Sequence, residues 1–207
     1  MHTEVLTLAG PAGALEAKLE YEDTEAAPTA FGVVCHPHPL FGGTMDNKVT
    51  HVLARAMIER GAPAFRFNFR GVGASGGAFD NGRGEVDDLA AVVAEGRRRY
   101  PSAALWLGGF SFGAFVALRA AERLAPAKLV AVAPPVARFE LGDVAHPDCD
   151  WMLVQGDADD VVPPDAVLAW AEKQPHKPRL HVLAGAGHFF HGRLHDLKPL
   201  VLDFLGS

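Results

Sequence analysis

The chain has 207 residues, with 25 acidic and 19 basic side chains and a formal net charge of −6 at pH 7. Hydrophobic residues make up 49% of it and charged residues 21%, a balance that excludes an intrinsically disordered protein. The acidic charge, without a basic stripe, argues against nucleic-acid binding. The one basic run, Arg97–Arg99, is expected at a solvated helix end.

The first residues, MHTEV, have neither a positively charged start nor a following apolar run, so no signal peptide is expected. The two cysteines, Cys35 and Cys149, are expected to be free thiols. Together these features predict a cytoplasmic protein with no membrane partner.

The first predicted element is an antiparallel hairpin, because two partly alternating runs, residues 4–8 and 14–21, flank the turn Ala9-Gly10-Pro11-Ala12-Gly13. Short and strongly apolar segments follow, most with the composition of strands that are buried on both faces. These segments are residues 31–35, 64–69, 104–107, 129–132, 151–154 and 180–183.

Most of these strands are separated by segments with helical spacing of apolar residues, at 49–57, 86–93 and 114–124. A later helix is predicted to open at Pro163-Pro164, and another to end the chain. Alternating strands and helices predict a parallel sheet with helices on both faces. No repeat or linker is visible, so residues 1–207 are expected to form one domain. The segment 134–149 is too broken by proline and glycine to form a large lid.

The strongest local motif is Gly109-Phe110-Ser111-Phe112-Gly113, which joins a predicted strand to a predicted helix. A serine at such a turn presents its hydroxyl above the sheet, and the flanking glycines let neighbouring backbone pass closely. The sequence therefore predicts Ser111 as a nucleophile, with the Phe112 N–H at the helix start as an oxyanion donor.

A second copy of the motif, Gly73-Ala74-Ser75-Gly76-Gly77, has no helix after its serine, so Ser75 is not expected to be a nucleophile. The overlapping run Gly71–Gly76 has the glycine spacing of a dinucleotide-binding motif. No helix is predicted directly after it, so a dinucleotide site is not expected there. No cofactor is expected.

A serine nucleophile needs a base and an acid that orients the base. His188 in Gly185-Ala186-Gly187-His188 follows the last predicted strand and is the expected base, whereas His181, His191 and His195 are expected in a strand or the last helix. The segment 156–163 offers three carboxylates for the acid, Asp157, Asp159 and Asp160, and spacing alone does not choose among them.

These three motifs together resemble the α/β-hydrolase superfamily over essentially the whole chain, and most closely small lidless bacterial members near the dienelactone-hydrolase group. The resemblance implies a three-layer sandwich with a mostly parallel sheet of about eight strands and no cap domain. It also implies that Asp159 is the acid. Dienelactone hydrolases carry a cysteine where this chain has Ser111. The resemblance therefore does not imply that this chain acts on their substrate.

In that superfamily the loop at residues 36–43 would supply a second oxyanion donor. Pro37 and Pro39 have no N–H, which leaves His38 or Leu40, and Leu40 is slightly preferred. Zinc ligation by His36 with His38, or by His188 with His191 and His195, is not favoured, because neither group has a complement of further ligands.

The expected reaction is hydrolysis of a small-molecule carboxylic ester or thioester by a Ser111–His188–Asp159 triad. Six phenylalanines near these loops are expected mainly in the core, with one or two forming a shallow acyl pocket; they are Phe41, Phe110, Phe112, Phe115, Phe189 and Phe190. The alternatives are a peptidase or amidase that uses the same triad, and a non-catalytic binding protein that retains the fold.

Overall fold

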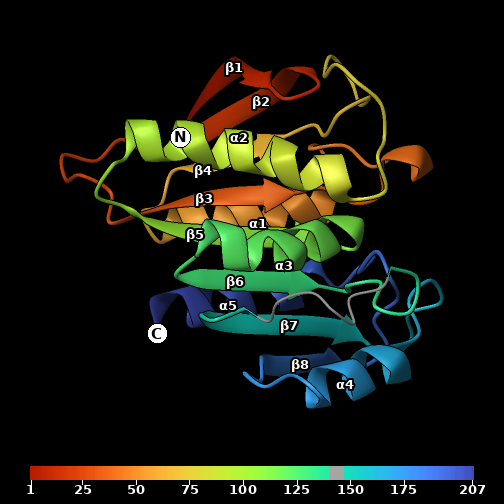
Figure 1. Cartoon of the computed structure of the whole chain (residues 1–207). Coiled ribbons are helices and arrows are strands. Elements are labelled where there is room, and N and C mark those ends of the chain that lie inside the picture. The colour runs from red at the N-terminus through yellow and green to blue at the C-terminus, as the bar shows by residue number, and fades with distance from the viewer. Residues whose placement is uncertain (140–146) are drawn as a thin grey trace.

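The computed structural model describes residues 1–139 and 147–207 and shows an eight-stranded sheet between two layers of helices (Figure 1). The strands are β1 (His2–Gly10), β2 (Gly13–Tyr21), β3 (Ala30–Cys35), β4 (Ala64–Phe67), β5 (Ala104–Phe110), β6 (Lys128–Val132), β7 (Asp150–Gly156) and β8 (Arg179–Leu183). The helices are α1 (Lys48–Glu59), α2 (Arg83–Arg99), α3 (Phe112–Leu124), α4 (Pro164–Glu172) and α5 (Leu194–Gly206), with a short 3₁₀ helix at Pro39–Phe41. The predicted three-layer α/β architecture is confirmed.

The strand order is β1-β2-β4-β3-β5-β6-β7-β8. β1 and β2 form the predicted antiparallel hairpin, β2 pairs antiparallel with β4, and every later neighbouring pair is parallel. The carboxyl ends of the parallel strands therefore lie along one edge of the sheet, on the right in Figure 1. Ligand sites in open parallel sheets form at this edge.

The two helical layers bury two separate apolar clusters against the sheet. Helices α1 and α5 cover one face, and α2, α3 and α4 cover the other (Figure 1). Helix α1 begins where Asn47 Oδ1 accepts hydrogen bonds from the N–H groups of Val49 and Thr50, which satisfies donors that have no partner inside the helix. It is followed by Gly61 at φ +80°, a conformation that glycine adopts without steric cost.

Four local predictions differ from the structure. β8 is largely exposed, because it is the last strand of the sheet and lacks a neighbour on one side, so its apolar composition does not imply burial. β5 continues through Gly108 and Gly109 to Phe110, whereas β4 already ends at Phe67. His191 lies in a turn before α5 and does not share a helix with His195.

The segment expected to be too broken for a lid falls partly on residues 140–146, which lie outside the described residues. On its described part, Pro135 O accepts hydrogen bonds from the N–H groups of Arg138 and Phe139, which forms a compact turn after β6. Among the helices that the structure describes, none has the length and apolar character needed to cross a bilayer.

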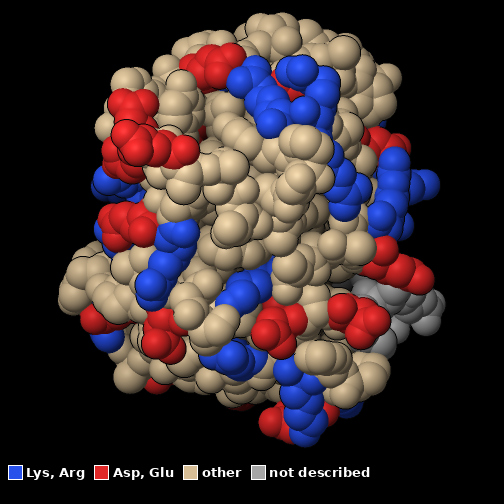
Figure 2. Space-filling model, turned by 90° about the vertical axis from the view of Figure 1, so that its left-hand side faces the viewer, with Lys and Arg blue, Asp and Glu red and all other residues tan. Residues whose placement is uncertain are grey.

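The basic run at Arg97–Arg99 ends helix α2, as predicted. Arg98 and Arg99 form ion pairs with Glu95, and Arg99 also pairs with Glu4. On the side of the molecule that carries the amino-terminal edge of the parallel strands, acidic and basic side chains are interspersed (Figure 2). Arg98 and Arg99 are thus matched by nearby carboxylates, whereas Arg97 donates a hydrogen bond to the carbonyl oxygen of Leu124.

Candidate active site

Ser111 lies at the sharp turn between β5 and α3, with backbone angles φ 53° and ψ −120°. Residues other than glycine seldom adopt this conformation, and surrounding contacts must hold it in place. A Cβ atom at Gly109 would collide with the carbonyl oxygen of Gly113, and one at Gly113 would collide with the carbonyl oxygens of Cys35 and His36. The two glycines of the motif are therefore required because backbone passes directly beside them.

The loop after β8 carries His188 and is held against the loop after β7. Asp157 Oδ1 accepts a hydrogen bond of 2.6 Å from the Gly185 N–H, and the Ala158 N–H donates to the carbonyl oxygen of Ala186. The imidazole of His188 packs against the ring of Phe110, with 5.1 Å between the ring centres. These contacts fix the imidazole above the carboxyl ends of the strands.

The Asp159 carboxylate is buried at the end of β7 and accepts several hydrogen bonds. Oδ1 accepts from the N–H groups of Val161 and Val162, and Oδ2 accepts from the Gln155 side chain at 3.0 Å. Burial raises the pKa of Asp159, but the hydrogen bond from His188 and those from the two amides lower it more, so the net pKa is below its usual range. Asp159 is therefore ionised at neutral pH.

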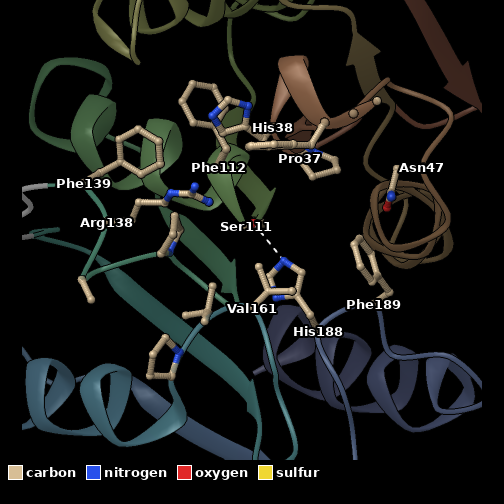
Figure 3. Close-up of a pocket in the computed structure, with 17 residues that line it drawn as sticks. Pro37, His38, Asn47, Ser111, Phe112, Arg138, Phe139, Val161, His188 and Phe189 are labelled. Atoms are coloured by element: carbon tan, nitrogen blue, oxygen red, sulfur yellow. Dashed lines mark hydrogen bonds between the residues drawn. The ribbon is translucent and has the colours of Figure 1, made fainter.

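Ser111, His188 and Asp159 form one hydrogen-bonded chain, of which Figure 3 shows the link between Ser111 and His188. His188 Nε2 lies 3.1 Å from Ser111 Oγ, and His188 Nδ1 lies 2.8 Å from Asp159 Oδ2. Because an ionised carboxylate only accepts hydrogen bonds, Nδ1 carries the imidazole proton and Nε2 presents a lone pair to the serine hydroxyl. The three residues singled out in the sequence are thus brought together, and the arrangement is suited to removing the proton from Ser111 Oγ.

The other two carboxylates of the segment 156–163 do not reach the imidazole. Asp157 holds the loop of His188 through Gly185, and Asp160 is exposed. Ser75, the serine of the second motif copy, accepts a hydrogen bond from the Glu16 N–H and donates one to the carbonyl oxygen of Asn68. Its hydroxyl therefore links β2 to the chain after β4.

Of the expected oxyanion donors, Phe112 is the first residue of α3, and its N–H precedes the hydrogen-bonded part of the helix. For the second donor, the preference for Leu40 conflicts with the structure. The Leu40 N–H donates to Nδ1 of His38, and Leu40 is 68% exposed and does not line the pocket. The His38 N–H has no hydrogen-bond acceptor within residues 1–139 and 147–207, which makes it the better candidate.

Ser111 and His188 open into a pocket of about 460 Å³ whose walls are mainly apolar or aromatic. Three of the six phenylalanines, Phe41, Phe112 and Phe189, line it, more than expected, and Phe139 joins them. The remaining three, Phe110, Phe115 and Phe190, are buried in the core. The His38 ring lies at the centre of this aromatic wall, 5.1 Å from Phe112 and 4.7 Å from Phe41, measured between ring centres.

His36 is buried and has a structural place. Its Nδ1 lies 2.6 Å from the carbonyl oxygen of Pro37, and its Nε2 accepts a hydrogen bond from the Phe69 N–H. Because the carbonyl can only accept, the proton lies on Nδ1 and the ring is neutral. Neither His36 with His38 nor any other set of histidine, cysteine and acidic residues forms a potential metal-binding group in the part of the chain that the structure describes.

Burial lowers the pKa of His36 to about 4, although its hydrogen bond to Pro37 opposes this. In the unfolded chain the same histidine takes up a proton near pH 6.5, so between pH 6.5 and about 4 only the unfolded state is protonated. We expect this group to reduce the free energy of unfolding by about 3 kcal/mol as the pH falls through that window. Urea unfolding of wild type and His36→Gln at several pH values measures this contribution. The free energy of unfolding should fall more steeply with decreasing pH in wild type than in the variant. Equal slopes for the two proteins would contradict the low pKa of His36.

Three pocket or support residues were not anticipated from the sequence. Gln155 orients Asp159, and Asn47 and Arg138 line the pocket. Two of them left a signal: Asn47 stands where a helix N-cap is expected, and Gln155 is a polar residue at the end of an apolar strand. Arg138 lies in an irregular turn, and no pattern in the sequence marks it.

Comparisons with known proteins agree with this geometry. A family model described as "Serine aminopeptidase, S33" matches residues 40–147. An uncharacterized protein of Rickettsia prowazekii is 34% identical over 206 residues, with 95% of this chain and 86% of the relative covered.

Two solved structures are similar over nearly the whole chain. The first, a lidless α/β serine hydrolase from Xanthomonas campestris, is 43% identical with a TM-score of 0.94, and the match covers 99% of this chain and 94% of that one. The second, an α/β serine hydrolase homologue from Coxiella burnetii, is 42% identical with a TM-score of 0.93 and coverage of 99% and 98%.

Proposed function

Since the chain belongs to the α/β-hydrolase superfamily, we propose that it hydrolyses carboxylic esters or thioesters through an acyl-enzyme on Ser111. The observation that carries this proposal is the hydrogen-bonded chain from the Ser111 hydroxyl through His188 to Asp159, at the floor of an apolar pocket. Asp159 is ionised, and each ring nitrogen of His188 has a hydrogen-bond partner suited to its proposed role.

In the first half of the reaction, Ser111 Oγ attacks the substrate carbonyl carbon while His188 Nε2 takes the hydroxyl proton. The ionised Asp159 stabilises the imidazolium that forms. The tetrahedral intermediate collapses, the bond to the alcohol or thiol breaks, and His188 returns the proton to that leaving group. A water molecule, deprotonated by His188, then attacks the acyl-enzyme and releases the acid and free Ser111.

The developing negative charge on the carbonyl oxygen requires hydrogen-bond donors. We assign this role to the backbone N–H groups of Phe112 and His38, which have no other acceptor within the described residues. In serine hydrolases, one such donor typically contributes about 10²-fold or more in rate. Because both donors are backbone groups, the pocket side chains remain free to determine which acyl or alcohol group is bound.

The description of the matching family model favours one alternative, an aminopeptidase. An aminopeptidase substrate carries a cationic α-ammonium group close to the scissile bond, and carboxylates are the usual partners of such a cation. None of the described residues that line the pocket is Asp or Glu, and Arg138 places a positive charge there. Ester or thioester hydrolysis is therefore the better supported reaction.

A panel of substrates separates the two reactions. We expect p-nitrophenyl esters of short and medium acyl chains, and the corresponding thioesters, to be hydrolysed with saturation kinetics. The p-nitroanilides of alanine and leucine should be hydrolysed at background rates, because the pocket has no described partner for their ammonium group. Anilide turnover with kcat/KM equal to or above that of the esters would support the aminopeptidase instead.

A further inference from the structure

Arg138 is a cationic side chain in an otherwise neutral, apolar pocket. The turn after β6 fixes its backbone, because its N–H donates a 3.0 Å hydrogen bond to the carbonyl oxygen of Pro135. From this turn the side chain extends into the pocket toward Ser111 (Figure 3). The guanidinium lies over the ring of Phe41, 5.5 Å from its centre, a distance at which cation–π attraction contributes.

The charge of Arg138 has no counter-ion among the described residues. Some of the other arginines are paired with carboxylates, among them Arg66 with Glu20 and Arg70 with Asp88. No described pocket residue is acidic, although the chain as a whole carries six more negative than positive charges. Within the described residues, Arg138 thus places a cation without a paired carboxylate on the wall of the pocket.

The neighbouring imidazole adds no second charge. Burial lowers the pKa of His38, and the positive charge of Arg138 lowers it further, so the ring is neutral at pH 7. The ring of Phe139 and that of Phe112 complete the wall on this side. The guanidinium of Arg138 is exposed and lies over the Phe41 ring, so it is available to an anion that enters the pocket.

From this arrangement we propose that the enzyme selects esters or thioesters that carry a carboxylate, and that Arg138 binds this carboxylate. The inference rests on the proposed function, because it names the class of substrate for the same Ser111. A planar guanidinium donates two parallel hydrogen bonds to a carboxylate, a pairing that an ammonium group does not reproduce. Monoesters of dicarboxylic acids, or esters of an alcohol that itself bears a carboxylate, meet this requirement.

The test compares two pairs of esters that differ only in the charged group. In the first pair, p-nitrophenyl hydrogen glutarate carries the carboxylate on the acyl side, and the p-nitrophenyl ester of isoheptanoic acid replaces that carboxylate by an isopropyl group. In the second pair, the butyrate ester of p-hydroxyphenylacetate carries it on the alcohol side, and the butyrate ester of p-isobutylphenol is the neutral match. The quantity measured is the ratio of kcat/KM for the anionic ester to that for the neutral one.

We expect Arg138→Met to lower this ratio by about tenfold to a hundredfold in at least one pair, the range for loss of a hydrogen bond to a charged group. Arg138→Lys should restore part of the ratio, and added salt should reduce it in wild type but not in Arg138→Met. Arg98→Met is the matched control, since it removes the same charge from an exposed ion pair at the end of α2. It should leave the ratio unchanged.

The inference is overturned if Arg138→Met changes the ratio by less than about twofold in both pairs. That result is distinguishable from failure of the proposed function. If the neutral esters are hydrolysed by wild type and not by Ser111→Ala, the hydrolase assignment holds and only the role of Arg138 is wrong. If no ester is hydrolysed at a rate that depends on Ser111, both proposals fail.

Discussion

Ser111→Ala is expected to abolish ester hydrolysis, with a loss in kcat on the order of 10⁴-fold or more, because nothing else at the turn can form the acyl-enzyme. Within the described residues, the hydroxyl is the hydrogen-bond partner of His188 Nε2. The methyl side chain of alanine leaves the base without a proton to remove. The same variant should no longer react with a fluorophosphonate probe, which labels activated serines covalently.

Mass spectrometry of the intact protein measures the labelling directly. We expect wild type to take up one probe molecule and Ser111→Ala to take up none. Ser102→Ala, at an exposed position before β5, is the matched control and should be labelled like wild type. Persistent labelling of Ser111→Ala would contradict the assignment and direct attention to Ser75. Complete inertness of wild type toward probe and esters would favour a non-catalytic binding protein.

Asp159→Asn is expected to lower kcat by about 10⁴-fold with little change in the shape of the site. The amide has nearly the same size as the carboxylate, and its oxygen can still accept from the N–H groups of Val161 and Val162. Its NH₂ group would then face Nδ1 of His188, which favours a proton on Nε2. In that tautomer the imidazole has no lone pair for the hydroxyl of Ser111.

The neighbouring aspartates provide matched controls with the same change in charge. Asp160 is exposed, so Asp160→Asn should leave kcat within about twofold of wild type. Asp157→Asn should also cost little, because an amide oxygen can still accept the hydrogen bond from the Gly185 N–H. Steady-state kinetics of the three variants measures the contrast. Equal losses in all three would mean that the loop as a whole matters and that Asp159 has no separate role.

The proposed nucleophile and base could be located from the sequence because each depends on a short continuous segment. Ser111 stands between a strand and a helix whose patterns are both clear, and His188 follows the last strand in a glycine-rich loop. The choice of Asp159 over Asp157 and Asp160 required the family resemblance. It depends on how the loop after β7 turns, and three nearby carboxylates give no sign of that turn in their spacing.

Other features depend on contacts between segments that the sequence does not bring together. The N–H of Leu40, which was the preferred second oxyanion donor, donates a local hydrogen bond to the side chain of His38. It is therefore not directed at the pocket. The exposure of β8 follows from its place at the edge of the sheet, which residue composition does not reveal. Arg138 reaches the pocket only because the turn after β6 folds beside Phe41.

The close approach of Gly113 to the carbonyl groups of Cys35 and His36 has a consequence for how such a protein can diversify. The main chain that begins α3 passes directly beside the main chain that leads to His38, so a close backbone contact helps to set the separation of the two amides. We therefore expect that mutations of Phe41, Phe139 or Phe189 can reshape what the cavity accepts with little change in the geometry of the two proposed oxyanion donors. Recognition and catalytic power can change separately within one small scaffold.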